Sequence, residues 1–435
     1  MKPKRWSPAV GTQLEHKLKT DTLGPGFNRL FGASAISNLA DGLLAVAVPL
    51  LAISLTKSPV LISILSALVM LPWLLFAIPI GLIVDRANKR LLLTLTNSLR
   101  FVIAGLLALA ISTDFITVYW LFLATFLIGI CEVASDTAAQ SLIPVILQKK
   151  HFERANSRLN IAETVIQNFI GAPLSGFLYA SAIVLPFILN SAGFLIAAIF
   201  VFLIPAHLII EAKDSDQEPA EKKSFFGDIK FGLKYLWNHP DLRGLVTITT
   251  SLGFFYALST STIILFITET LELPAKFFGL LMAGAGSGAI IGAFVTPMIS
   301  KRFGRGKVLA LAIFISSITV FMQALSPNYW FFGVIGFISS FFITNWNILL
   351  MSCYQVLIPT ELYGRIHGAR RTFVWGMMPL GAFLGGVLAH AGLRTPLLVG
   401  GLATTIISLA SLKFINRIGR ETSQGDHNEE LQTHE

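Results

Sequence analysis

Five charged residues interrupt stretches of the chain that are otherwise apolar, and their side chains are the ones best suited to do chemistry. They are Asp41, Arg100, Glu132, Asp136 and Glu163. An ionised group at the middle of a bilayer costs about 2.5–3.5 kcal/mol, so it persists inside a helix bundle, usually with a partner. Carboxylates beside a guanidinium take up and release protons as their surroundings change, so proton transfer is the chemistry that this pattern favours.

Position along the chain brings three of these charges to one depth. Counted from the inner end of its own apolar stretch, Asp41 is about twelve residues in and Arg100 about ten; Glu132 is about twelve residues from Pro144, at the end of the LIP motif that follows its span. At 1.5 Å per residue all three lie about 15–18 Å deep, so we expect them to meet. Asp136 lies one helical turn from Glu132, on the same face and nearer the inner end.

Twelve apolar stretches position these charges, and each is long enough to cross a bilayer as a helix. Hydrophobic residues make up 54% of the chain and charged residues 13%. An ordinary globular domain has roughly a quarter charged residues, so a soluble protein is excluded. The predicted spans are residues 30–55, 59–84, 91–112, 115–138, 159–180, 184–206, 244–268, 277–299, 307–325, 329–352, 372–391 and 395–415.

The spans form two sets of six, which predicts an all-α membrane protein with two six-helix bundles, at residues 30–206 and 244–415. Residues 207–243 begin with a polar run that predicts a linker. In the second half of this linker, SFFGDIKFGLKYLWNHP, apolar residues recur at helical spacing with lysines between them. That pattern predicts an amphipathic helix at the membrane surface. Residues 1–29 and 416–435 are predicted to be an N-terminal segment and a C-terminal tail.

Lysine and arginine collect on one side of the predicted membrane. Of the 33 such residues, Arg100 lies within a span, and Lys57, Lys276 and Arg394 are the three that fall on the side opposite to the rest. Because cytoplasmic loops collect Lys and Arg, both termini and the linker are predicted to be cytoplasmic, in a multi-pass protein of the cell inner (plasma) membrane. The same bias accounts for the net charge of +9, so no nucleic-acid partner is needed to explain it.

A short charged loop, GLIVDRANKR at residues 81–90, reverses the chain between the second and third spans. Its spacing resembles the loop signature of the major facilitator superfamily, G-x-x-x-D-R-x-G-R-R. The matching residues are Gly81, Asp85, Arg86, Lys89 and Arg90. Asn88 stands where the signature has glycine, and because asparagine tolerates the left-handed backbone that glycine would adopt, this departure changes the match only slightly. The resemblance implies that this hinge loop, linked to Asp136, locks one end of the protein in one conformation.

The fifth span resembles the signature of the exporters of this superfamily, G-P-x-x-G. Gly171, Pro173 and Gly176 match it, with Ala172 inserted between the first two. Glycine removes a side chain and proline removes a backbone donor, so this helix is predicted to be thin and bendable.

Further features make the chain similar to the branch that holds macrolide exporters and the enterobactin exporter. They are SNLADG in the first span, Arg100 in the third, and LIP at residues 142–144 and again at 357–359, each before a basic loop. The resemblance implies two pseudo-symmetric halves with the substrate between them, near the midplane. Glu132 departs from the pattern, since many drug exporters of the superfamily carry an arginine there.

The C-terminal half contributes aromatic and other adaptable side chains in place of charges. Aromatic residues and Met bind bulky apolar molecules with loose geometry, which favours such a substrate over a sugar. The predicted substrate-cavity residues are Phe254, Phe255, Tyr256, Asn345, Trp346, Trp375 and Met378.

Three functions follow as hypotheses. The first is a proton-coupled exporter of drugs, macrolides or siderophores, working by alternating access, in which Asp41, Arg100, Glu132 and Glu163 handle the proton. The second is a transporter of another substrate, such as a lysophospholipid or a metabolite. The third, a membrane-embedded enzyme, needs a nucleophile or base with an orienting partner at one depth, and His390 has no acid near it in sequence.

Cofactors are not expected. The chain has no G-x-x-x-x-G-K-[ST] motif, so ATP is not predicted as the energy source. Cys131 and Cys353 both fall inside apolar stretches, which indicates neither a disulfide nor a metal site. The predicted partners are a small-molecule substrate, protons and the lipid bilayer, and the protein is expected to function as a monomer.

Overall fold

The computed structural model describes residues 23–147, 155, 158–159, 162–205, 234–358 and 362–432. Within these ranges the regular elements are all helical, which confirms the predicted all-α class. The first half comprises α2 (Gly24–Leu55), α3 (Pro59–Arg86), α4 (Lys89–Ser112), α5 (Val118–Ile146), η2 (Ala162–Gly171), α7 (Ala172–Ser181) and α8 (Leu185–Phe202).

The second half begins at Pro240 and repeats this helical plan. It comprises α11 (Pro240–Thr260), α12 (Ile263–Leu265), η3 (Phe266–Thr270), α13 (Ala275–Phe303), α14 (Arg305–Ala324), α15 (Tyr329–Leu357), α16 (Tyr363–Leu388), η5 (Ala389–Ala391) and α17 (Thr395–Gln432).

Ten of the described helices are long and apolar enough to cross a membrane, and α11 with the following α12 and η3, bent by 41°, makes an eleventh. The remaining predicted span, 159–180, is formed by η2 and α7 in succession, each of 10 residues. The reason for the split lies in Pro173, which cannot donate to the carbonyl of Phe169 and crowds the preceding turn. The turns before it widen into the π-helix η2.

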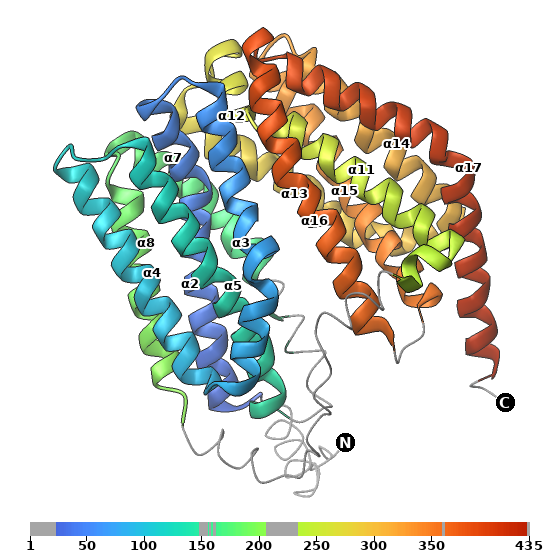
Figure 1. The fold of residues 1–435 in the computed structure, drawn as a ribbon, viewed down its shortest axis with the longest axis horizontal. Helices are drawn as coiled ribbons and strands as arrows, with labels where there is room; N and C mark the ends of the chain where they lie inside the picture. Colours follow the sequence, from blue (N-terminus) through green and yellow to red (C-terminus); the bar gives the residue numbers. More distant parts are fainter. Residues whose placement is uncertain are drawn as a thin grey trace, which may run out of the picture.

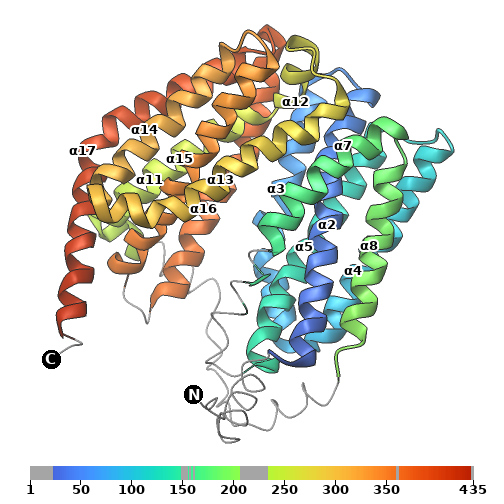
Figure 2. The same cartoon turned by 180° about the vertical axis from the view of Figure 1, so that it is seen from behind.

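The two halves lean together at one end and diverge toward the other (Figure 1). Figure 2 shows the same arrangement from behind. Packing between the halves is made chiefly by α3 against α16 and by α7 against α13. We call the end that carries the start of α2 and the end of α17 the inner side, and the opposite end the outer side.

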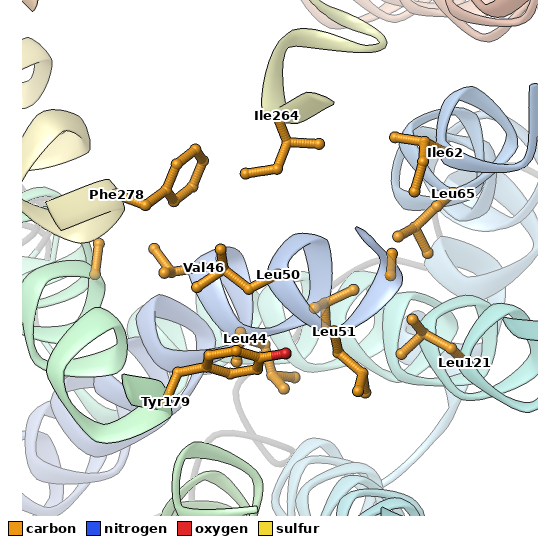
Figure 3. Close-up of a cluster of buried hydrophobic side chains, with 14 of the residues drawn as sticks. Leu44, Val46, Leu50, Leu51, Ile62, Leu65, Leu121, Tyr179, Ile264 and Phe278 are labelled. Atoms are coloured by element: carbon orange, nitrogen blue, oxygen red, sulfur yellow. The ribbon is translucent and has the colours of Figure 1, made fainter. Parts of the chain in front are cut away.

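The apolar core explains this shape. One buried cluster joins the halves on the outer side, where Ile264 and Phe278 point toward Leu50 of α2 and Leu65 of α3 (Figure 3). Toward the inner side the core divides. One cluster there contains residues of the first half, such as Phe27 and Leu142, and another contains residues of the second half, such as Leu309 and Ile415. The protein is therefore closed on the outer side.

Asn88 lies in the turn between α3 and α4. Asn88 does not adopt the left-handed backbone, because its φ is −68° and its ψ is 106°. Its side chain instead accepts a hydrogen bond from the backbone N–H of Leu91, 3.1 Å away, and caps the start of α4. Asparagine therefore supports this turn as a helix cap.

The linker and the tail are described in part. Residues 206–233, which hold most of the predicted amphipathic helix, lie outside the described residues. Residues 234–238 are helical, with Leu236 buried and Trp237 64% exposed. At the other end of the chain, α17 continues beyond the predicted span end at 415 as far as Gln432.

Candidate functional site

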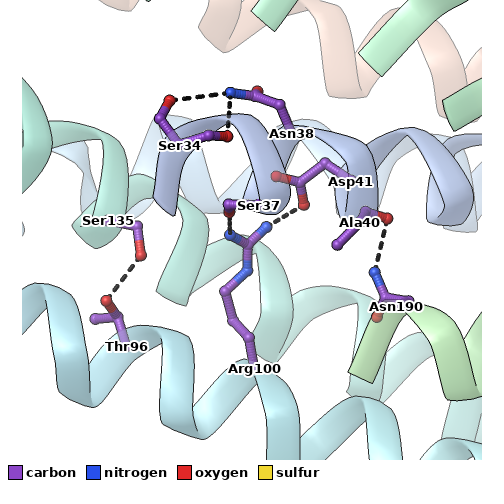
Figure 4. Close-up of polar contacts among 9 residues, drawn as sticks. All are labelled: Ser34, Ser37, Asn38, Ala40, Asp41, Thr96, Arg100, Ser135 and Asn190. Carbon is purple, nitrogen blue, oxygen red and sulfur yellow. Dashed lines mark hydrogen bonds and ion pairs between the residues drawn. The ribbon is translucent and has the colours of Figure 1, made fainter. Parts of the chain in front are cut away.

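An ion pair between α2 and α4 lies at the centre of the first half. The Arg100 guanidinium donates through Nη2 to Asp41 Oδ1 and through Nη1 to Ser37 Oγ, the latter at 3.1 Å (Figure 4). Its carbon Cζ lies 4.0 Å from the centroid of the Phe194 ring of α8. The side chain of Arg100 is 1% exposed and that of Asp41 is 14% exposed. The predicted meeting of Asp41 and Arg100 is confirmed.

Helix packing fixes α2 around Asp41. Asn190 of α8 donates to the carbonyl of Ala40 at 2.7 Å, and Ser175 of α7 donates to the carbonyl of Leu43 at 2.6 Å. A Cβ on Gly42 would lie 2.4 Å from the backbone oxygen of Gln167, so only glycine allows α2 and η2 to approach this closely. The flexible sequence SNLADG thus becomes a closely packed segment.

A cavity of about 390 Å³ lies beside this ion pair and takes its lining from both halves. Most of the lining is aliphatic or aromatic, and Ile264, Phe278 and Met282 close it on the side of the second half. Asp41 and Glu132 supply the carboxylates. The cavity thus combines apolar walls with two carboxylates, which suits a bulky, mostly apolar ligand and a transferable proton.

Glu132 lies on a different helix from Asp41. It comes from α5 and lines the same cavity as Asp41. Within the described part of the chain, Asp41 has Arg100 as its ionic partner, whereas no cation lies within 4 Å of Glu132. The two carboxylates therefore differ in their surroundings.

The predicted hinge residues lie away from this cavity. Arg90 Nη2 donates to the carbonyl of Phe202 at the end of α8, and its Cζ lies 5.1 Å from the Phe202 ring centroid. Lys89 begins α4, and Gly81 has open space where a Cβ would stand. The side chains of Asp85 and Arg86 lie outside the described residues, so their link to Asp136 stays a prediction.

Two of the five intramembrane charges are exposed. Asp136 lies on α5 toward the inner side, and Glu163 lies in η2. Neither lines the cavity that contains Asp41.

The exporter-type residues form contacts between helices. A Cβ on Gly171 would lie 2.9 Å from Cα of Gly42, and a Cβ on Gly176 would lie 3.2 Å from the backbone N of Gly279 in α13. A Cβ on Gly279 would lie 2.8 Å from Cα of Pro173. The fifth span is therefore packed against the opposite half at this signature.

The predicted substrate residues of the second half are only partly brought together. Tyr256, Trp346, Trp375 and Met378 line a second cavity, of about 450 Å³. Phe254, Phe255 and Asn345 do not line it. The ring centroids of Phe254 and Phe255 lie 5.1 Å apart, and the buried Asn345 accepts a hydrogen bond from Thr296 at 2.5 Å.

Sequence reasoning missed polar residues that line the first cavity. They are Ser66, Thr125, Gln167, Thr260 and Ser261. Gln167 had a signal, because it lies one turn from both Glu163 and Gly171 in a span that is otherwise largely apolar. Ser66 and Thr125 had none, since single hydroxyl residues are common in membrane helices.

Comparison with known proteins decides the family. A family model of the Major Facilitator Superfamily matches residues 30–382. The chain belongs to this superfamily. Its structure agrees, because a mutant of the nucleoside transporter NupG superposes with a TM-score of 0.71 at 12% identity, covering 89% of this chain and 99% of NupG. That likeness shows the shared fold.

Relatives in the superfamily confirm the predicted branch. The multidrug efflux pump Tap of Mycobacterium tuberculosis is 25% identical, covering 90% of this chain and 92% of the pump. Macrolide efflux protein A of Streptococcus pyogenes is 20% identical, covering 88% of this chain and 94% of that protein. The enterobactin exporter EntS of Shigella boydii is 23% identical, covering 79% of this chain and 80% of EntS. The protein is thus a membrane transporter of small molecules with efflux relatives.

Proposed function

We propose that this transporter exports bulky, mostly apolar small molecules from the cell in exchange for protons. The observation that supports the proposal best is the cavity shared by Asp41 and Glu132, which lies between the halves and is closed on the outer side. In this proposal the inner side faces the cytoplasm, and the protein works as a monomer in the plasma membrane.

The substrate class is proposed from the lining of the cavity. Its walls are largely aliphatic, with Phe278 and Met282 from the second half, so binding a large apolar surface is favourable. The names of the relatives agree with this proposal, since they describe a multidrug pump, a macrolide efflux protein and an enterobactin exporter. Drugs, macrolides and siderophores are therefore the proposed substrates.

Proton coupling is proposed to use Asp41, with Glu132 as the second candidate. Asp41 is held by Arg100, and rocking of the halves changes the access of water to both. A proton moving down about 100 mV supplies roughly 2.3 kcal/mol, which sustains a neutral substrate gradient on the order of 50-fold. One exchanged proton is thus enough for useful efflux.

The test begins with a susceptibility panel of drugs, macrolides and siderophores in a transporter-depleted host, which identifies a substrate. Export of that substrate is then measured in inside-out vesicles with an imposed pH gradient. We expect Asp41→Asn to abolish uphill, protonophore-sensitive transport while downhill exchange continues. Full uphill transport by Asp41→Asn and Glu132→Gln, singly and together, would show that neither residue couples protons.

Matched controls exist in the chain. Asp114 and Glu272 are exposed residues outside the α-helices, both with a φ of 55°, and neither lines the cavity. Asp114→Asn and Glu272→Gln remove the same kinds of charge, so both are expected to keep uphill transport. Uphill accumulation of the substrate inside right-side-out vesicles would instead favour an importer.

A further inference from the structure

The second half carries a groove that is separate from the cavity lined by Asp41. Here α11 packs beside α16 and α17 (Figure 1). The groove has a volume of about 400 Å³. Its walls come from residues 234–238, the first three turns of α11, and Phe373 of α16.

Two cations stand at the inner-side rim of this groove. Lys234 and Arg243 line it, both are exposed, and no acidic residue is among its lining residues. Arg243 Nη1 lies 3.5 Å from the backbone carbonyl oxygen of Trp237, which ties Arg243 to the helical segment 234–238. Asp241, two residues before Arg243, is paired with Arg417 at 2.7 Å. The rim is therefore positively charged and suited to an anion.

Hydroxyl groups line the groove farther along α11 than the two cations. Thr247, Thr250 and Ser251 recur along one face of α11, and Ser251 lies about 12 Å below Arg243 at 1.5 Å per residue. The hydroxyl oxygen of Thr250 is buried and has no hydrogen-bond partner within the described part of the protein. A buried hydroxyl without a partner is costly, so a ligand that accepts a hydrogen bond is expected to fill this position.

Apolar side chains complete the groove. Leu236, Val246 and Phe373 line it together with the indole of Trp237. Tryptophan prefers the boundary between the hydrocarbon and the headgroups, and basic residues near the surface attract anionic lipids. The order of groups from rim to interior is thus cation, hydroxyl and hydrocarbon.

We propose that this groove binds one anionic phospholipid from the leaflet on the inner side. Lys234 and Arg243 contact the phosphate, a hydroxyl of α11 donates to an ester carbonyl, and an acyl chain lies against Val246 and Phe373. The cavity of about 450 Å³ in the second half is lined by a different set of α11 residues, which includes Leu252 and Tyr256. The bound lipid therefore packs against the face of α11 that does not line the 450 Å³ cavity, and it takes no part in substrate binding.

The experiment is lipid titration of the purified, delipidated full chain, with bound lipid counted by native mass spectrometry. Phosphatidylglycerol and phosphatidylcholine are the probes. For the wild type we expect one tightly held phosphatidylglycerol and no matching phosphatidylcholine. The double variant Lys234→Gln with Arg243→Gln should bind phosphatidylglycerol with an affinity about 30-fold lower, as the loss of two cations near the surface predicts.

A matched control is available on the same side of the membrane. Lys301 and Arg302 are two exposed cations at the end of α13, and neither lines the groove. Lys301→Gln with Arg302→Gln removes the same charge and should leave the tight site unchanged. Thr250→Val is a second test that leaves both rim cations in place, and it should weaken phosphatidylglycerol severalfold.

Three outcomes would overturn the proposal. They are equal binding of phosphatidylglycerol by the wild type and by both groove variants, equal weakening in the control variant, and displacement of the lipid by glycerol phosphate at the same concentration. The last outcome would indicate a site for free phosphate compounds. Because the readout is bound lipid, it is independent of transport.

Discussion

Arg100 is the largest fully buried side chain in the described part of the protein. Its charge is balanced by Asp41, and its planar face lies over Phe194. Removing one member of a buried pair leaves an uncompensated charge, at a cost of about 3–5 kcal/mol. The same pair that is proposed to handle protons therefore also holds α4 to α2.

Substitution of Arg100 separates these two roles. Arg100→Ala should lower thermal stability and reduce both uphill transport and downhill exchange, because Asp41 is left without its partner. The thermal stability and transport of Arg100→Lys should lie between those of Arg100→Ala and the wild type. An ammonium can pair with Asp41 but lacks the planar fork that also reaches Ser37. The neutral pair Asp41→Asn with Arg100→Met should recover stability relative to Arg100→Ala but not uphill transport. Thermal unfolding followed by size exclusion, together with vesicle transport, measures both.

Asp85 gives a second prediction at this scale. It lies one residue before the end of α3, next to the turn into α4. A carboxylate that bonds helix N-termini or an arginine in the closed inner side contributes on the order of 1–3 kcal/mol to that state. Asp85→Asn should therefore reduce the transport rate while expression and substrate binding stay near wild type. Transport at the wild-type rate by this variant would show that Asp85 does not lock the inner side, and the charge of the hinge loop would then serve only to orient the protein in the membrane.

At the scale of helices, hydropathy predicted where the spans lie but not how they break. Every predicted span has a helical counterpart, yet η2 and the bend after α11 came only from the structure. At that bend the carbonyl of Ser261 accepts a hydrogen bond from Ser66 of α3, 2.9 Å away, in the other half. A partner so distant in sequence leaves no local pattern. For the same reason the lining role of Ser66 was not predictable.

Glycine contacts between helices give a prediction at this scale. A Cβ on Gly279 of α13 would lie 2.3 Å from the backbone oxygen of Ala172, so Gly279→Ala pushes the halves apart on the outer side, at a cost of about 1–3 kcal/mol. The variant should favour the outward-open state. Impermeant thiol reagents should then label Ser66→Cys faster than in the parent protein.

Gly284, in the same helix, is the control for that measurement. A Cβ at Gly284 would meet nothing within 4 Å, so Gly284→Ala should leave the labelling rate unchanged. Equal rates in Gly279→Ala and the parent would show that this contact does not hold the outer side closed.

For the whole molecule, the sequence predicted the two halves but not the side on which they open. The halves followed from twelve spans and the polar stretch between them, as the described helices confirm. The conformation open on the inner side and the one open on the outer side each bury apolar surface at the closed side and expose it at the open side. The amino-acid composition therefore does not distinguish the two conformations. The structure does, because the core cluster on the outer side joins both halves while the two inner-side clusters stay separate.

Orientation in the membrane is the last prediction, and it depends on the charges at the two ends. Lys57 lies in the outer-side turn between α2 and α3 and pairs with Glu269 of the second half, whereas the basic residues at the end of α13 and at the start of α16 lie on the inner side. Because lysine and arginine are retained in the cytoplasm, the inner side should face it. An impermeant maleimide applied to intact cells should label Lys57→Cys but not Ser215→Cys, which lies in the linker.

Background labelling should be small, since Cys131 and Cys353 are buried. Permeabilised cells should label Ser215→Cys, which shows that this position is reactive once the reagent reaches it. Equal labelling of both variants in intact cells would contradict the predicted orientation.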